Sequence, residues 1–310
     1  MRVAVQMDPI EKMVVNHDTS LMLMVEAQAR GHEIWWFAPD DLFYELGVVK
    51  ARAKRVWVSL EEGAHYKTVE EKILGVDDLD VVLVRQDPPF DMAYIANTYL
   101  LELTKALVIN PPRGIRNISE KTAILEFPEL IPNTWVGRDL DALEAFARRY
   151  EQVVLKILFM MGGSGVIKLS ASDPEFRAKA AAFMEEAQRE PVLVQEFLPA
   201  VSGGDKRVFV LNGEPFAALK RLPKEGDFRA NLAVGGQAAV GELDDDDRRI
   251  AAAVAPLLKR EGIVFAGLDV IAGKLIEINV TSPTLAQELK RLSGLDLPKA
   301  FWERVEAMRR

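Results

Sequence analysis

Residues 275–284 read LIEINVTSPT and combine an apolar β-strand with two polar side chains on one face. Because side chains alternate between the two faces of a strand, we expect Ile276, Ile278 and Val280 on one face and Glu277 and Asn279 on the other. A carboxylate and an amide that point the same way from such an apolar strand indicate a polar site beside a β-sheet.

A second carboxylate comes from the segment before this strand. Residues 262–271, GIVFAGLDVI, are also rich in β-forming residues, and Ala-Gly-Lys follows them. A hairpin with this three-residue loop sets Ile271 opposite Leu275 and Asp269 opposite Glu277. Like charges directly opposite each other destabilise a sheet by up to about 1 kcal/mol. The pair therefore favours a bound cation.

The chemistry of the side chains narrows the choice of cation. Asp269, Glu277 and Asn279 offer oxygen ligands only, which suit Mg²⁺ completed by water and nucleotide phosphates. A solvated hairpin face, with acids that serve solubility, explains the same spacing because any alternating strand has a polar side. The spacing alone leaves both interpretations open.

Strands and helices alternate along the rest of the chain, which predicts an α/β fold. Asp18 is placed to cap a helix that runs to Arg30 and ends at Gly31, and Pro111-Pro112 marks a boundary. We predict further strands at 2–7, 33–37, 81–85, 106–110, 153–157, 166–170 and 192–197, a hairpin over 205–221 on the Asn212-Gly213 turn, and helices near 91–105, 174–188, 244–260 and after Asp296.

Two strand ends are candidates for nucleotide binding. In KILFMMGGSGVI (156–167), Lys156 closes a strand before a glycine-rich turn, which suits either phosphate binding or a plain hairpin turn. In VLVQEFLP (192–199) the strand turns polar at Gln195-Glu196, where its backbone either meets an adenine edge or simply stops.

Three further segments carry charge toward a possible cleft. Arg207 shares a strand face with Phe209, so its charge enters a cleft or lies on a solvated edge. Residues 222–236 form a long irregular segment, either a functional lid or a disordered connector, whose main polar groups are Arg229 and Asn231. Arg85 stands at the carboxyl end of a strand, the usual ligand side of an open α/β sheet.

Composition limits the classes of protein that this chain can represent. At 310 residues, 49% of them hydrophobic and 28% charged, the chain is long enough for two or more domains. No apolar run is long enough to span a membrane and Asp8 comes too early for a signal peptide, so we expect a cytoplasmic protein. It has no cysteine and three separated histidines, which exclude thiol chemistry and disfavour a histidine metal site, and its net charge of −8 argues against nucleic acid.

Taken together and in order, the motifs resemble those of the prokaryotic glutathione synthetases, a family of the ATP-grasp superfamily. The matching segments are MDPI, RQDPPFD, SEK (119–121), VLK (154–156), the Met-Gly-Gly turn, VQEFLP, GGDKRV, RANLAVGG, GLDVI and IEINVTSPT. The segments DPPFD and EINVTSPT are specific to that family, whereas the lysine and Glu-x-Asn positions occur in ATP-grasp ligases at large.

The resemblance implies an ATP-grasp fold with an N-terminal Rossmann-like (pre-ATP-grasp) domain. The implied domains are an N-terminal substrate domain (1–120), a central lid domain (121–197) and a C-terminal domain (198–310) with the metal site and a mobile loop (222–236). The implied reaction joins γ-glutamylcysteine to glycine through an acyl phosphate, with ATP as co-substrate and Mg²⁺ as cofactor. We expect a homo-oligomer.

The resemblance also implies roles for individual residues. The nucleotide would contact Lys121, Lys156, Met161, Gly162, Gly163, Gln195, Glu196, Phe197, Leu198 and Asp205. Catalysis would use Lys156, Arg207, Arg229 and Asn231, and Mg²⁺ would bind Asp269, Glu277 and Asn279. The substrates would contact Arg85, Arg207, Arg229, Ser282, Pro283 and Thr284.

One segment departs from the family pattern. Where the family has a sequence like Lys-Pro-Leu-Asp-Gly-Met-Gly-Gly, this chain has Ile157, Phe159 and Met160 in place of the proline, the acid and the first glycine. We expect an exposed, mobile loop here, whose two large apolar side chains either cover the phosphates or hinder closure. Two alternatives therefore stay open, namely another ATP-grasp ligase and a nucleotide-binding protein with impaired catalysis.

Overall fold

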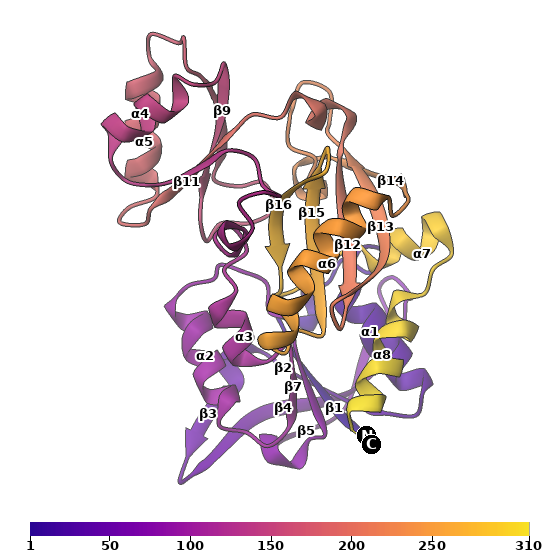
Figure 1. Cartoon of the computed structure of the whole chain (residues 1–310). Coiled ribbons are helices and arrows are strands. Elements are labelled where there is room, and N and C mark those ends of the chain that lie inside the picture. Colours follow the sequence, from indigo (N-terminus) through magenta and orange to yellow (C-terminus); the bar gives the residue numbers. More distant parts are fainter. Residues whose placement is uncertain (310) are drawn as a thin grey trace.

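The computed structural model describes residues 1–309 and contains three β-sheets. Each sheet is formed by a continuous part of the chain, and Figure 1 shows the sheet that carries β9 and β11 standing apart from the rest of the molecule. No helix among residues 1–309 is both long and apolar enough to cross a membrane. Helices and strands alternate along the chain, so the predicted α/β fold class is confirmed.

The N-terminal sheet has seven strands in the order β3-β4-β2-β1-β6-β7, with β5 paired to β4. Its parallel centre consists of β1, β2, β6 and β7, as the βαβ pattern predicted. The elements are β1 (Arg2–Gln6), α1 (Thr19–Ala29), β2 (Glu33–Phe37), β3 (Leu42–Glu45), β4 (Val48–Val58), β5 (Tyr66–Gly75), β6 (Val81–Val84), α2 (Met92–Glu102), β7 (Leu107–Ile109) and α3 (Pro112–Asn117). Asp18 caps α1 by accepting a hydrogen bond from Leu21 N at 2.7 Å.

The central sheet has four strands in the order β10-β9-β11-β8, all antiparallel. Its elements are β8 (Thr134–Gly137), α4 (Leu140–Ala147), β9 (Gln152–Ile157), β10 (Val166–Ser170), α5 (Phe176–Glu186) and β11 (Val192–Glu196). A separate apolar core joins the two helices to one face of this sheet, with Leu143, Phe146, Phe183, Val153 and Val194 among its members.

The C-terminal sheet has five strands in the order β14-β13-β12-β15-β16. Its strands and helices are β12 (Asp205–Leu211), β13 (Glu214–Leu222), β14 (Gln237–Gly241), α6 (Asp245–Arg260), β15 (Phe265–Ile271), β16 (Lys274–Asn279), α7 (Ala286–Ser293) and α8 (Leu297–Met308). The predicted hairpin on Asn212-Gly213 is confirmed, and both residues take the positive φ that this tight turn requires. One sheet face packs against α6, and the other faces the N-terminal part of the molecule.

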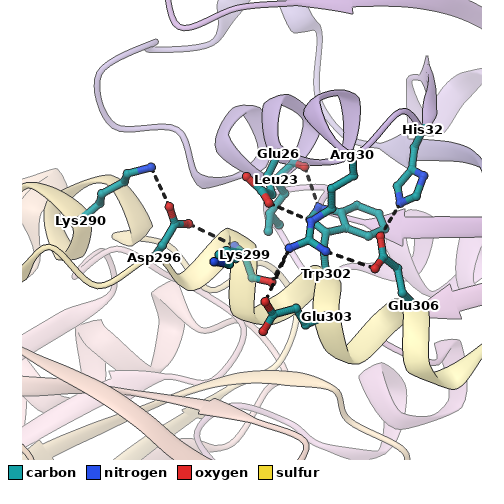
Figure 2. A network of polar contacts seen from close by, with 10 residues as sticks. All are labelled: Leu23, Glu26, Arg30, His32, Lys290, Asp296, Lys299, Trp302, Glu303 and Glu306. Carbon is teal, nitrogen blue, oxygen red and sulfur yellow. Dashed lines mark hydrogen bonds and ion pairs between the residues drawn. The ribbon is translucent and has the colours of Figure 1, made fainter.

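The last two helices pack against the N-terminal part although they follow the C-terminal sheet. Figure 2 shows Arg30, the C-cap residue of α1, bound to Glu306 of α8; the distance is 3.1 Å, and His32 Nε2 lies 3.0 Å from the same carboxylate. The indole N–H of Trp302 donates to Leu23 O at 2.8 Å, and the Trp302 side chain is fully buried. The predicted boundaries at 120 and 197 fall between the three sheets, but α8 docks on α1.

The β15–β16 hairpin differs from its predicted geometry. Its loop has two residues rather than three, because Ile271 pairs with Lys274 and Val270 with Leu275. A bulge opposite the step from Asp269 to Val270 then makes Ile276 the extra residue and restores Asp269 opposite Glu277.

The bulge also corrects the predicted strand faces. Leu275, Ile278 and Val280 are buried in the core, whereas Ile276 lines the same cleft as Glu277. The predicted grouping of Ile276 with Ile278 and Val280 is therefore wrong. The predicted pairing of the two carboxylates, Asp269 and Glu277, is confirmed.

Candidate active site

A cleft between the central and C-terminal sheets gathers most of the predicted site residues. Its apolar walls come from strands of both sheets, including Val154, Val166 and Ile276. The predicted residues that line it are Lys121, Lys156, Met161, Gly162, Gly163, Gln195, Glu196, Phe197, Leu198, Asp205, Arg229, Asn231, Asp269 and Glu277. Arg207, Asn279, Arg85 and Ser282–Thr284 lie outside this lining.

Two lysines line the cleft together with the glycine-rich turn. Lys156 is buried on β9 with its Nζ 3.8 Å from Glu277 Oε1. Burial lowers the pKa of Lys156, while Glu277 opposes that shift. Lys121 donates to the backbone oxygens of Leu158 and Met160, at 3.2 Å for the first. Lys121 thereby holds the glycine-rich turn in place beside Lys156.

The glycine-rich turn and the long loop lie against each other. Gly162 and Gly163 have φ of 65° and 86°, a conformation that other residues rarely adopt. From residues 222–236, Arg229 Nη1 donates to Gly163 O at 3.0 Å, and Asp227 holds the same guanidinium at 2.7 Å. A Cβ on Gly163 would lie 3.2 Å from Asn231 Oδ1. The long loop therefore covers this part of the cleft.

Backbone N–H groups just after Gln195 form hydrogen bonds within the protein, which the sequence did not indicate. The backbone N–H groups of Glu196 and Phe197 donate to Asn133 O and Gln152 O at 3.0 and 2.9 Å. Those two N–H groups already have acceptors within the protein, so they are not free to bind a nucleotide base. The Phe197 ring meets Phe228 of the long loop edge-on at 6.0 Å, which adds an aromatic wall to the cleft.

Two aspartates that line the cleft, Asp205 and Asp269, are held by buried ion pairs. Arg207 Nε donates to Asp269 Oδ1 at 2.6 Å, and Arg221 contacts Asp269 Oδ2 at 2.9 Å and Asp205 Oδ2 at 2.6 Å. Burial alone would raise the pKa of Asp269, but Arg207 and Arg221 lower it to about 2. Asp205, predicted to contact the nucleotide, is thus already held by Arg221. Sequence reasoning missed Arg221 because a single arginine inside a strand carries no motif.

The donor set on β15 and β16 fits Mg²⁺. Asp269 and Glu277 are paired across the two strands and Asn279 lies opposite Gly267, so all three offer oxygen atoms on neighbouring positions. Among residues 1–309 no three acidic or histidine side chains form a metal cluster. A hard cation here would consequently complete its shell with phosphate oxygens and water. Its ligation by Asp269 would exchange with the contacts from Arg207 and Arg221.

Two of the predicted substrate residues, Arg85 and Thr284, line a second cavity, whereas Arg229 lines the cleft and Arg207, Ser282 and Pro283 line neither. Arg85 is buried and donates from Nε to Ser20 Oγ and from Nη2 to Pro283 O, both at 2.9 Å. Ser282 Oγ donates to Asp87 Oδ1 at 3.0 Å. The polar residues that line this cavity are Asp8, Lys12, His17, Asp18, Thr19, Ser20, Arg85, Asp87 and Thr284.

The segment that departs from the family pattern is exposed and makes one aromatic contact with the N-terminal part of the chain. The ring of Phe159 lies 6.1 Å from the ring of Phe90. Met160 covers Gly165, where a Cβ would come within 2.7 Å of its sulfur. The predicted exposure is confirmed for Phe159 and Met160, which are 36% and 40% exposed, whereas the predicted mobility of the loop stays a prediction.

Two juxtaposed sheets that enclose a cleft lined by two lysines, a glycine-rich turn and facing carboxylates have the architecture of an ATP-grasp ligase. Solved structures agree on the fold: D-cycloserine synthetase DcsG superposes with a TM-score of 0.71 at 14% identity, covering 99% of this chain and 100% of that one. The ATP-grasp ligase PsnB, complexed with its minimal precursor, gives 0.64 at 19% identity and 99% coverage of both chains.

Family models and relatives identify the family. Residues 1–116 match the N-terminal domain of prokaryotic glutathione synthetase and residues 120–294 match its ATP-grasp domain. Glutathione synthetases from Mesorhizobium japonicum and Rhodopseudomonas palustris are 40% and 42% identical to this chain, with all of it and 99% of each relative aligned. The chain belongs to the prokaryotic glutathione synthetase family and is an ATP-grasp ligase.

Proposed function

We propose that this ligase condenses γ-glutamylcysteine with glycine to form glutathione, at the expense of ATP. The observation that carries the proposal is the presence of two polar sites in a chain of this family: the cleft with Lys156 and Glu277, and the separate cavity lined by Arg85 and Thr284. In this proposal the cleft takes the nucleotide, and the cavity takes the substrate whose carboxylate attacks the terminal phosphate. The remaining alternative is a different carboxylate or amine substrate for the same chemistry.

The reaction requires two displacement steps. A carboxylate oxygen of γ-glutamylcysteine forms a bond to the γ-phosphorus while the bond to the β-phosphate oxygen breaks, which gives an acyl phosphate and ADP. The nitrogen of glycine then bonds to the acyl carbon and phosphate leaves. Two protons of the ammonium group are lost, one with the phosphate and one to the solvent.

The residues of the cleft supply charge and position rather than a covalent nucleophile. Lys156 carries positive charge to the nucleotide phosphates, and Lys121 holds the glycine-rich turn that lines the same cleft. Arg229, bound to Gly163, keeps the long loop over the acyl phosphate and excludes water. Mg²⁺, held by Asp269, Glu277 and Asn279, would neutralise charge on the β- and γ-phosphates.

The cavity around Arg85 suits an amino-acid head group. Arg85 offers a guanidinium to a carboxylate, and Asp18 and Asp87 offer anions to an ammonium group. Burial raises the pKa of Asp18, and the neighbouring Arg85 opposes this shift. We therefore place the glutamyl end of γ-glutamylcysteine here, with its reacting carboxylate directed toward Ser282 and the cleft.

The products of ATP distinguish this reaction from adenylation. We expect ADP and phosphate, with no AMP or pyrophosphate, because the attack is on the γ-phosphorus. The measurement is chromatography of the spent nucleotide, with glutathione quantified by mass spectrometry and with each substrate omitted in turn. Release of AMP would contradict acyl-phosphate chemistry, and turnover that persists without γ-glutamylcysteine would contradict the substrate.

We further propose that the chain forms a homo-oligomer in the cytoplasm, where ATP is supplied. Support for association comes from apolar side chains exposed on and beside the edge strand β5, namely Leu46, Trp57, Val69 and Ile73. We expect sedimentation to give a mass at least twice that of one chain. A monomer at micromolar concentration would contradict this assembly, and activity outside the cytoplasmic fraction would contradict the location.

A further inference from the structure

A small cavity with apolar walls lies where the N-terminal part of the chain meets the glycine-rich turn. Pro88 and Phe90 come from one side and Phe159 and Met161 from the other. The remaining lining residues are Ile115, Ile118, Ser119, Glu120, Leu158 and Thr281. Met161 also lines the phosphate cleft, so the two spaces share a wall.

The polar side of this cavity is formed by Ser119 and Glu120. Glu120 Oε1 accepts a hydrogen bond from Thr281 Oγ1 at 3.0 Å, and the backbone oxygen of Glu120 accepts from Ile278 N at 3.0 Å. The hydroxyl of Ser119 is buried and has no hydrogen-bond partner among residues 1–309. Within the same residues no lysine, arginine or histidine forms an ion pair with Glu120.

Glu120 is half-buried and has no ion-pair partner, although the charges of Lys121 and Arg207 act on it from a distance. Carboxylates without an ion-pair partner concentrate at sites where a ligand supplies the opposite charge. The lining of the cavity contains no basic side chain, so it offers nothing to bind a carboxylate or phosphate group, whereas Glu120 attracts a cationic one. Its narrow apolar walls exclude a hydrated metal ion. A small organic ammonium group satisfies both conditions and can donate to Glu120 and to Ser119.

The position of the cavity selects one of the two ammonium groups in the reaction. The glutamyl ammonium group lies at the far end of γ-glutamylcysteine, where Asp18 and Asp87 already offer anions beside Arg85. The cavity, in contrast, shares Met161 with the cleft, and its Thr281 lies two residues beyond the end of the strand that carries Glu277 and Asn279. This position beside the cleft suits the amine that attacks the acyl phosphate.

We propose that Glu120 and Ser119 bind the ammonium group of the amine substrate, glycine, in this cavity. The assignment rests on the proposed function and adds a binding site for its second substrate. Glu120 then orients the nitrogen toward the acyl phosphate, and the rings of Phe90 and Phe159 limit the side chain that the amine can carry. Glycine, which has none, fits such walls best.

The test is steady-state kinetics with each substrate varied in turn. Glu120→Gln removes the negative charge and keeps the shape, so we expect the KM for glycine to rise at least tenfold while the KM values for ATP and γ-glutamylcysteine stay within twofold. Ser119→Ala should raise the glycine KM about threefold. Glu129→Gln, an exposed glutamate nine residues further on, is the matched control and should change none of the three constants.

The possible outcomes separate this proposal from the proposed function. Wild-type enzyme that makes no glutathione would contradict the function itself. Normal wild-type activity with an unchanged glycine KM in both variants would overturn the cavity assignment alone. A rise confined to the KM for γ-glutamylcysteine would also overturn it, because the cavity would then hold the glutamyl ammonium group. Should Glu120→Gln fail to fold, Ser119→Ala decides the question by the same constants.

Discussion

Turnover is expected to fall by about 10²–10³-fold in Glu277→Gln, with the fold retained. The substitution removes one anionic oxygen ligand from the face formed with Asp269 and Asn279, and it also removes the carboxylate 3.8 Å from Lys156 Nζ. Side-chain volume is almost unchanged, so the β15–β16 pairing should persist. The kinetic measurement is glutathione formation at saturating substrates over a series of Mg²⁺ concentrations.

A second readout separates metal binding from catalysis. Addition of Mg²⁺ and ADP should raise the melting temperature of the wild-type protein, since a ligand that binds only the folded state stabilises it. We expect that increase to shrink in Glu277→Gln. Glu214→Gln, an exposed glutamate at the start of β13 in the same sheet, should behave like wild type. If Glu277→Gln turned over as fast as the wild type, we would conclude that the hairpin face is a solvated surface with no role in metal binding.

Asn110→Leu is expected to lower the free energy of unfolding by about 3–5 kcal/mol. Asn110 is buried at the end of β7, and its Nδ2 donates to Phe265 O and Val280 O at 2.7 and 2.6 Å. Its Oδ1 accepts from Val264 N and Phe265 N at 3.0 and 3.1 Å. One side chain thus satisfies four backbone groups between the N-terminal and C-terminal sheets, and leucine leaves all four without a partner.

Denaturant titration followed by circular dichroism measures this loss. Asn110→Asp gives a sharper comparison, because it keeps the acceptor but points a negative oxygen at two carbonyl groups, so we expect it to be at least as destabilising. Asn117→Leu is the control, since Asn117 is exposed and donates only to Glu261. If Asn110→Leu is as stable as the control, Asn110 does not connect the two sheets in solution.

Local patterns in the sequence predicted most of the secondary structure. The β12–β13 hairpin followed from Asn212-Gly213, because that pair takes the positive φ angles of a tight turn. The start of α1 followed from Asp18, which does cap the helix. Strands β3, β4 and β5 went unpredicted, because their charged, half-exposed faces lack the apolar runs by which the central strands were recognised.

The facing carboxylates were predicted for a partly wrong reason. A three-residue loop and a regular ladder gave the same pairing of Asp269 with Glu277 as the actual two-residue loop and bulge. The bulge itself left no mark in the sequence, since it depends on how Ile276 packs against the cleft. The difference matters for the site because it turns Ile276 toward the cleft.

Residue types and their order along the chain were enough to predict the α/β class, the family motifs and the oxygen-ligand face. Those features depend on strand periodicity, turn chemistry and ligand preference, which act over a few neighbouring residues. Tertiary structure alone decided that Arg221 holds Asp205 and Asp269, that Phe159 meets Phe90, and that Glu120 faces a cavity without a cation. Except for Asp205 and Arg221, which pair across one hairpin, these partners lie tens of residues apart in the chain. Their contacts exist only once the three sheets have packed and desolvated the charges between them.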